Sequence, residues 1–165
     1  MPVIVRPVVP ADIAAITLIY AYHVSYGTGS FETEPPDSLE MARRFNEVKA
    51  KGLPWLVAED GGEIGGYAYA SPYRARIAYR HTVEDSIYVH ADRLGTGLGK
   101  LLMPALISET QACGMRQMVA VIGDSANLAS IHLHRTFGFC DAGLLKDVGF
   151  KFNRWLDTVF MQRSL

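Results

Sequence analysis

The chain has 165 residues, 49% of them hydrophobic, which suits one globular domain over residues 1–165 with its own core. A formal net charge of −1 gives no general attraction to nucleic acid or to an anionic membrane, and no apolar run approaches the ~18 residues of a membrane span. Two lone cysteines form no metal-like or disulfide pattern, so we expect a cytoplasmic protein with neither nucleic-acid nor membrane partners.

The first half of the chain alternates apolar stretches with turn signals. In order it predicts a strand, a helix, a loop, a second helix and a hairpin, over residues 3–8, 10–22, 26–36, 37–51 and 54–71. The second helix is capped by Asp37 and ended by Gly52. The two hairpin strands are joined by a turn at residues 60–62.

The second half of the chain predicts one loop and two helices that alternate with strands. It indicates a loop, a strand, a helix, a strand, a helix and a terminal pair of strands, over residues 73–80, 82–90, 97–113, 115–122, 125–137, 139–146 and 153–163. The all-apolar run at residues 115–122 is typical of a strand buried on both faces inside a mixed sheet. The order of elements predicts an α/β fold with a mixed sheet.

One stretch carries a chemical signal. A strand that begins at Glu84 runs into a loop with glycines at 95, 97 and 99 and then into a helix. The first N–H groups of a helix have no intrahelical partner, and the helix dipole adds partial positive charge there. With Lys100 beside it, this loop can hold a polyphosphate, with Glu84 at the other end of the stretch. Its spacing fits neither a P-loop nor a dinucleotide fingerprint, and by glycine count alone a simple tight turn explains it equally well.

Two motifs resemble those of a known family. Leu94-x-x-Gly97-x-Gly99 is similar to the pyrophosphate loop of the GNAT superfamily of N-acetyltransferases, which follows the fourth strand and opens with Gln or Arg where this chain has Leu94. Binding by main-chain N–H groups does not depend on that side chain. The second signature runs from Asn127 to Phe139 and carries His134 where most members have tyrosine.

The closer resemblance covers nearly the whole chain and is to the phosphinothricin and methionine sulfoximine acetyltransferases of that superfamily. The matching stretches are Ser30-Phe31-Glu32, Tyr73-Arg74-Ala75-Arg76, Thr82-Val83-Glu84, residues 95–99, His134 and Gly149-Phe150-Lys151. The resemblance implies a single-domain GNAT-like fold whose central sheet of about six or seven strands is mixed, mostly antiparallel and flanked by helices. It also implies acetyl-CoA as co-substrate, no metal, a homodimer and a role in antibiotic or herbicide resistance.

The resemblance further implies an acetyl-CoA site along the strand, the loop and the two helices that follow. Its residues are Ile87, Tyr88, Val89, Gly95, Thr96, Gly97, Leu98, Gly99, Lys100, Asn127 and Ser130. In the family a main-chain N–H near Tyr88 or Val89 stabilises the oxyanion that develops on the thioester. Asn127 is expected to contact the pantetheine arm of coenzyme A, although an asparagine at a helix start is often just a cap.

Acetyl transfer to an amine needs a base, because the amine arrives as an ammonium. Glu84 is the expected base, and the alternative is a surface strand glutamate. His134 is the expected proton donor to the departing thiolate, since an imidazole can donate near neutral pH, and the alternative is a structural helix histidine. His132 and His134 are two apart on a helix, so they form no metal-ligand pair and no metal site is expected.

The acceptor side of the site is predicted from an arginine-rich loop. Guanidinium groups bind carboxylates or phosphinates through two N–H donors, which suits the acidic end of an amino-acid analogue. Arg74, Arg76, Tyr79 and, from an earlier loop, Phe31 are therefore candidate substrate-binding residues. A solvated basic loop is the plainer interpretation of the arginines.

Taken together, these residues predict an acetyl-CoA-dependent N-acetyltransferase that transfers acetyl directly to the α-amino group of a small amino-acid-like substrate, such as phosphinothricin or methionine sulfoximine. Two alternatives stay open. One is a different acceptor amine, such as a polyamine or a protein N-terminus, although the arginines disfavour a cationic acceptor. The other is a non-catalytic acyl-CoA-binding sensor in which Glu84 has no role.

Overall fold

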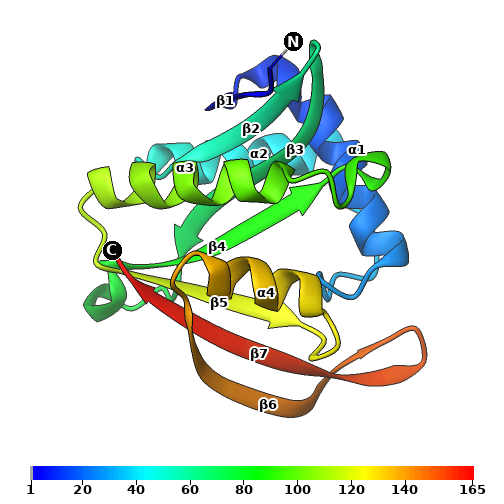
Figure 1. Ribbon diagram of the computed structural model, residues 1–165, viewed down its shortest axis with the longest axis vertical. Coiled ribbons are helices and arrows are strands. Elements are labelled where there is room, and N and C mark those ends of the chain that lie inside the picture. The colour runs from blue at the N-terminus through cyan, green and yellow to red at the C-terminus, as the bar shows by residue number, and fades with distance from the viewer. Residues whose placement is uncertain (1) are drawn as a thin grey trace.

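The structure is a computed structural model that describes residues 2–165, and it confirms the predicted α/β fold. Its strands are β1 (Ile4–Pro7), β2 (Trp55–Asp60), β3 (Glu63–Pro72), β4 (Thr82–Val89), β5 (Gln117–Gly123), β6 (Cys140–Lys151) and β7 (Arg154–Ser164). Its α-helices are α1 (Ile13–Tyr26), α2 (Ser38–Ala50), α3 (Leu98–Ala112) and α4 (Leu128–Thr136), and short 3-10 turns lie at Pro10–Asp12, Ile77–Tyr79 and Ala91–Arg93. The strands form a 7-stranded sheet in the order β1-β2-β3-β4-β5-β7-β6 (Figure 1).

The sheet is mixed and mostly antiparallel, as the resemblance implies. β4 and β5 form the parallel pair, with Thr82 opposite Gln117 and Asp85 opposite Ala120, and the other neighbours are antiparallel. A parallel pair needs a crossover connection, and α3 supplies it between β4 and β5. β7 lies between β5 and β6, so the final hairpin forms one edge of the sheet.

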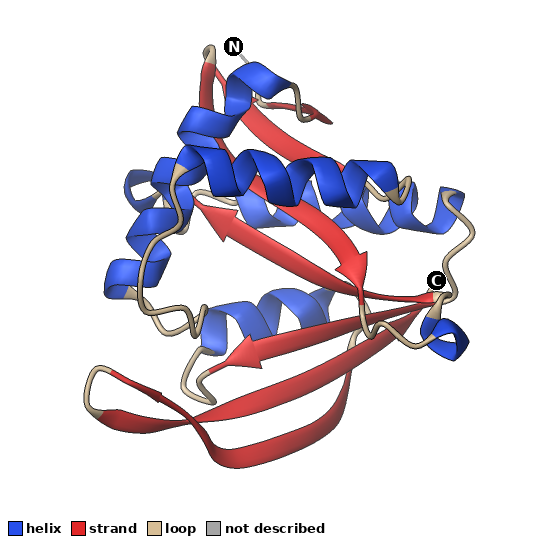
Figure 2. Cartoon of the chain, turned by 180° about the vertical axis from the view of Figure 1, so that it is seen from behind, coloured by secondary structure: helices blue, strands red, loops and turns tan. Residues whose placement is uncertain are grey.

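Helices cover both faces of the sheet. α1 and α2 lie on one face, and α3 and α4 lie on the other (Figures 1 and 2). The core between these layers includes Ile16, Tyr67, Leu102 and Met118, each 0% exposed, because the apolar stripe of each helix is buried against the apolar side of the sheet. No helix within residues 2–165 is both long enough and apolar enough to cross a membrane.

The ends of the helices follow from local chemistry. Asp37 caps α2, where its carboxylate accepts a hydrogen bond from the backbone N–H of Glu40 at 2.9 Å. α3 is preceded by Gly97 and followed within two residues by Gly114, whose backbones are left-handed with φ of +92° and +81°. An L-residue with a side chain is strained in that conformation, so glycine marks both ends of this helix.

Three features of the elements differ from the prediction. α1 continues to Tyr26, so the loop after it begins at Gly27. β6 continues beyond residue 146 to Lys151, and its register shifts between Leu145 and Gly149, which hides the alternation that marks a strand. β5 is buried on one face and half-buried on the other rather than buried on both, because α1 and α2 pack mainly on β2, β3 and β4.

Candidate active site

The site lies where two parallel strands separate. β4 and β5 pair only as far as Asp85 and Ala120, and beyond that point they diverge, as Figure 1 shows. A cavity of about 950 Å³ opens in this fork. It lies within the range of roughly 300–1,000 Å³ that is usual for ligand sites. β4, β5, the start of α3, α4 and the segment after α1 all contribute to its lining.

Most of the predicted site residues line this one cavity. They are Phe31, Glu84, Ile87, Tyr88, Val89, Gly95, Gly97, Leu98, Gly99, Lys100, Asn127, Ser130 and His134. Thr96 is outside the lining, and its hydroxyl donates to the carbonyl of Arg93 at 2.6 Å, which closes the turn before α3. The predicted residues of the arginine-rich loop are outside it as well.

That loop, residues 73–81, is exposed. The guanidinium of Arg74 stacks on the ring of Tyr73 at 4.4 Å and also donates to the Tyr73 carbonyl at 3.1 Å. Arg76 precedes the 3-10 turn that contains Tyr79, and the ring of Tyr79 meets the ring of Tyr73 edge-on at 5.7 Å. The positive charge of Arg74 acts to lower the pKa of Glu84, but burial and the charge of Asp85 have larger effects and raise it overall.

The N-terminus of α3 lies at one end of the cavity. Gly97 has no side chain, so no side-chain cap occupies the N–H groups of the first turn. Lys100 adds a positive charge at the same end. Arg93, by contrast, pairs with Asp60 and with Glu63 at 3.5 Å, and this turns its charge toward the β2–β3 hairpin. A polyphosphate at this end would meet backbone donors, the helix dipole and a lysine.

Glu84 lines the opposite part of the cavity, on β4. Its side chain is half-buried, and burial raises the pKa of this carboxyl, with the nearby charge of Asp85 raising it further. A carboxylate whose pKa lies above the ordinary value is a better proton acceptor. The position suits Glu84 to take a proton from an ammonium group that enters the fork.

His134 lines the cavity, and each of its two ring nitrogens has a hydrogen-bond partner. Nδ1 is 2.7 Å from the carbonyl oxygen of Ser130, and Nε2 is 2.9 Å from Oδ2 of Asp85. Burial alone would lower the pKa of His134, but the hydrogen bond and charge of Asp85, with the Ser130 carbonyl, raise it overall. Sequence reasoning missed Asp85, because nothing in the sequence links position 85 to position 134.

His23 is a second lining residue that sequence reasoning missed. Its Nε2 donates to the carbonyl oxygen of Val89 at 2.7 Å, at the end of β4. Burial lowers the pKa of His23 although this hydrogen bond opposes the shift. The neutral ring therefore fixes the end of β4 beside the cavity. Its place on α1 carries no sequence signal apart from a polar residue among apolar ones.

Phe31 forms an apolar wall of the cavity. A Cβ added to Gly149 would be 2.4 Å from Cε2 of Phe31, and one added to Gly123 would be 2.7 Å from Cε1. The ring therefore fits against Gly123 of β5 and Gly149 of β6 because neither position has a side chain. Sequence reasoning identified Phe31 as a site residue and Gly149 only as part of a family-like stretch, and it linked neither glycine to the ring. The two glycines lie 26 residues apart in the printed sequence.

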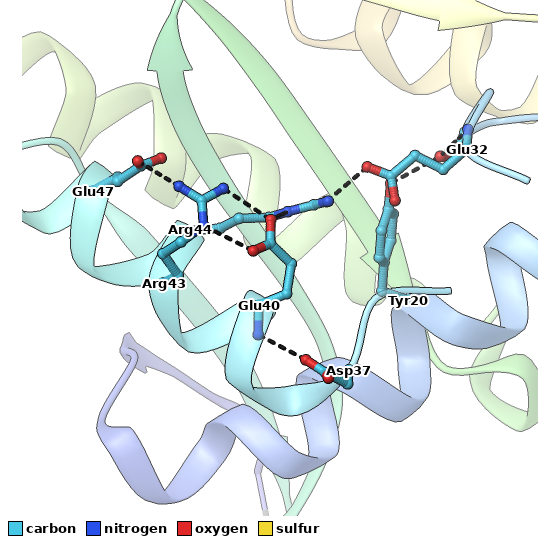
Figure 3. Close-up of polar contacts among 8 residues, drawn as sticks. Tyr20, Glu32, Asp37, Glu40, Arg43, Arg44 and Glu47 are labelled. Carbon is cyan, nitrogen blue, oxygen red and sulfur yellow. Dashed lines mark hydrogen bonds and ion pairs between the residues drawn. The ribbon is translucent and has the colours of Figure 1, made fainter. Parts of the chain in front are cut away.

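The residues on either side of Phe31 are anchored. The hydroxyls of Ser30 and Tyr20 are 2.8 Å apart, and Nζ of Lys151 donates to the Ser30 carbonyl at 2.8 Å. Glu32 pairs with Arg44 of α2 at 2.7 Å, and Figure 3 shows the same guanidinium reaching Glu40. These contacts to α1, α2 and β6 hold the segment against the fork.

The arrangement supports transfer chemistry between two bound molecules. It combines an anion-binding helix terminus, a carboxylate with a raised pKa and a buried imidazole in one cavity. β4 has no strand partner on its β5 side from residue 86 onward within the described chain, so its main chain can offer hydrogen bonds there. Among residues 2–165, no three His, Cys, Asp or Glu side chains form a metal-like group.

The sequence was compared with known protein families and curated proteins. A family model described as the acetyltransferase (GNAT) family matches residues 16–139. The chain is 53% identical over 161 residues to the phosphinothricin N-acetyltransferase of Alcaligenes faecalis, a match that covers 98% of this chain and 82% of that protein. It is 41% identical over 155 residues to the L-methionine sulfoximine/L-methionine sulfone acetyltransferase of Salmonella typhimurium (strain LT2), covering 94% and 90%.

The fold was also compared with solved structures. A crystal structure of a GNAT superfamily phosphinothricin acetyltransferase from Sinorhizobium meliloti, in complex with acetyl-CoA, matches with a TM-score of 0.96 and 48% sequence identity. The match covers 100% of this chain and 89% of that one. The similarity therefore extends over the sheet, the helices and the fork.

Proposed function

This chain belongs to the acetyltransferase (GNAT) family, and on that premise we propose that it acetylates the α-amino group of a small amino-acid analogue similar to phosphinothricin or methionine sulfoximine. Acetyl-CoA is the acetyl donor of this family of N-acetyltransferases and is bound in the related structure. One observation carries the proposal, namely that Glu84 and the first turn of α3 line the same cavity.

The donor end of the proposal is the N-terminus of α3. The diphosphate of acetyl-CoA would bind the N–H groups that follow Gly97, with Lys100 beside it. Asn127 and Ser130 at the start of α4 would contact the pantetheine arm, since both line the cavity between that end and the fork. Asn127 also caps α4, where its side-chain oxygen accepts from the Ser130 N–H at 3.3 Å, so it has both roles in this proposal.

The chemical step begins with a proton transfer. Acetyl-CoA supplies an acetyl group activated as a thioester. Glu84 takes a proton from the ammonium of the acceptor, and the raised pKa of its carboxyl favours that transfer. A main-chain N–H of Tyr88 or Val89, on the unpaired side of β4, stabilises the negative charge that develops on the carbonyl oxygen. His134 provides the proton for the departing thiolate.

The acceptor would bind between Phe31 and the arginine-rich loop. Phe31, which lines the cavity, would contact the apolar part of the substrate. Arg74 or Arg76, which lie outside the lining, would reach in from the loop to bind its carboxylate or phosphinate. Support for this arrangement comes from the charge of Arg74, which is close enough to influence Glu84. Tyr79 braces the loop through its contact with Tyr73. Acetylation removes the positive charge of the analogue, and a resistance role in the cytoplasm is part of the proposal.

A homodimer is also part of the proposal. The β6–β7 hairpin exposes a group of large apolar side chains, namely Leu144, Leu145, Val148, Phe150, Phe152 and Trp155, which are between 48% and 65% exposed. Exposed apolar groups of this size usually mark an interface. A second copy of the chain would bury them.

An acceptor panel tests the proposed function. Purified protein is mixed with acetyl-CoA and phosphinothricin, methionine sulfoximine, a polyamine or an N-terminal peptide, and the release of free thiol is followed. We expect turnover with the two analogues and none with their N-acetylated forms, which have no free amine. If the protein prefers the polyamine or the peptide, the proposed acceptor is wrong. Binding of acetyl-CoA without turnover on any amine would indicate a sensor.

A further inference from the structure

The fork contains a buried ion pair whose carboxylate has no role in the proposed mechanism. Asp85 of β4 and His134 of α4 meet at 2.9 Å, with side chains 1% and 3% exposed. Both residues line the cavity, and Asp85 belongs to the last residue pair before β4 and β5 separate. The ring is held by Phe139, whose ring meets it edge-on at 4.9 Å between centroids.

The hydrogen bonds define the protonation state of His134. Nδ1 faces a carbonyl oxygen of Ser130, which can only accept, so Nδ1 carries a hydrogen. Nε2 faces a carboxylate oxygen of Asp85, which accepts when ionised, so Nε2 carries a hydrogen too. With Asp85 ionised, either neutral tautomer would place a nitrogen lone pair against an oxygen lone pair. The imidazolium is the form that satisfies both neighbours of the ring.

Asp85 is the charged side chain that interacts with the His134 ring, because the nearby arginines have other partners. Arg135 on the same helix points away and pairs with Asp141 of β6 at 2.9 Å. Arg163 of β7 donates to the carbonyl of Phe137, beyond the end of α4. Glu84 adjoins Asp85 along β4, where successive side chains point to opposite faces. Oδ1 of Asp85 is buried with no hydrogen-bond partner among the described residues, so His134 is its main compensation.

A route for the proton follows from the same contacts. The hydroxyl oxygen of Ser130 is 3.4 Å from Nδ1 and Ser130 lines the cavity, whereas Nε2 faces Asp85. Loss of the Nδ1 proton leaves a bare nitrogen 2.7 Å from the uncharged carbonyl oxygen of Ser130, but the neutral ring keeps its Nε2–H bond to the charged Asp85. Loss of the Nε2 proton would instead leave a bare nitrogen against a carboxylate. Nδ1 is therefore the nitrogen from which a proton leaves at least cost.

We propose that Asp85 is a positioning residue that holds His134 as an imidazolium, and that Ser130 relays the proton of His134 Nδ1 to the departing thiolate. This inference rests on the proposed function. The Ser130 O–H bond breaks as an S–H bond forms, and the Nδ1–H proton restores the hydroxyl. The net change converts thiolate and imidazolium into thiol and neutral imidazole. A thiolate whose conjugate thiol has a pKa of about 8.5, the ordinary value for a cysteine thiol, accepts that proton.

The positioning role is tested without substrate. NMR titration of the histidine ring signals, with His134→Gln used to assign one of them, should show that His134 of the unmodified protein stays protonated at pH 7. In Asp85→Asn, which keeps the side-chain shape, its titration should move to lower pH. Asp141→Asn removes a surface carboxylate next to the same helix and should leave the titration unchanged. A neutral His134 at pH 7, or an unchanged titration in Asp85→Asn, would overturn the positioning role.

The relay is tested by the rate of a single turnover. With acetyl-CoA at saturating concentration, Ser130→Ala should slow acetyl transfer by about tenfold or more, and Ser130→Thr, which keeps a hydroxyl, should restore most of the rate. An unchanged rate in Ser130→Ala would overturn the relay. If the unmodified protein transfers no acetyl group to any amine, the proposed function fails, while the NMR titration still decides whether Asp85 and His134 form the ion pair.

Discussion

At the scale of single residues, two adjacent carboxylates have different environments. Glu84 is half-buried in the cavity, with a pKa raised by burial and by the charge of its neighbour. Asp85 is buried against His134. The alternation of side chains along β4 separates them, so one carboxylate can accept a proton from the acceptor amine while the other holds a buried imidazolium. In the proposed mechanism a single strand thus serves both proton transfers.

Phe31 leads to a prediction about acceptor binding. A methyl group at position 149 would be 2.4 Å from Cε2 of Phe31, so Gly149→Ala must displace the ring. We expect kcat/KM for the acceptor to fall by about tenfold, as for one methylene misplaced in an apolar pocket. The KM for acetyl-CoA should change by less than about twofold, because the N-terminus of α3 is untouched. Steady-state kinetics with each substrate varied in turn measures both.

Gly143→Ala is the matched control on the same strand. A Cβ at position 143 has no neighbour within 4 Å, so this variant should match the unmodified protein in both constants. Equal effects of Gly143→Ala and Gly149→Ala would show that β6 tolerates no side chain for reasons unrelated to Phe31. No effect of either would remove Phe31 from the acceptor wall.

The sequence predicted some site residues and not others for physical reasons. Glu84 and the glycine loop lie within one strand–loop–helix stretch, so their proximity follows from local structure. The pairing of Asp85 with His134 depends on a contact between β4 and α4. The two residues are 49 positions apart in the sequence, so no local pattern predicts the pair. Arg74 and Arg76 were identified by residue type, and the structure leaves them outside the cavity lining.

At the scale of elements, α3 places its first turn at the proposed anion site. Its first turn lies at the cavity, and its far end lies at Gly114. Gly97 and Gly114 both have left-handed backbones, with φ of +92° and +81°, and neither has an atom within 4 Å of an added Cβ. The same substitution at each end therefore costs similar backbone strain, on the order of 1–2 kcal/mol. Only one end is next to the proposed diphosphate.

This pair of glycines gives a prediction about the donor. Gly97→Ala and Gly114→Ala should lower the free energy of unfolding by similar amounts, measured by urea denaturation. Gly97→Ala should also weaken acetyl-CoA binding by about tenfold or more, since the N–H groups after residue 97 would shift, and calorimetry measures this. Gly114→Ala should bind acetyl-CoA normally. Equal affinities in the two variants would contradict a diphosphate site at the start of α3.

Most element positions were predictable, because apolar periodicity and glycine stops are local signals. The hairpin at residues 60–62 and the helix ended by Gly114 are examples. β6 was predicted too short, because its register shift between Leu145 and Gly149 breaks the alternation. The fork between β4 and β5 was not predicted, since the point at which two strands stop pairing is a long-range property that no local pattern shows.

At the scale of the whole molecule, the β6–β7 hairpin gives a prediction about assembly. Trp155 is 65% exposed and its ring lies 4.8 Å from that of Phe150 in the exposed apolar group. Trp155→Lys should convert a dimer into a monomer in sedimentation, because a charge would be buried in the interface. Leu18→Lys, at a position of α1 that is 73% exposed, is the control and should stay dimeric. A monomeric unmodified protein would contradict the proposed homodimer.

The most direct test of Glu84 as the catalytic base is the pH dependence of kcat/KM for acetyl transfer, compared between the unmodified protein and Glu84→Gln. The unmodified protein should lose activity as the pH falls through the pKa of Glu84, at a pH above the ordinary glutamate value of 4.5, since the base must be ionised. Glu84→Gln should turn over about 100-fold more slowly with unchanged affinity for acetyl-CoA. Equal turnover by the two proteins would contradict the account, because the fork would then contain no base at residue 84.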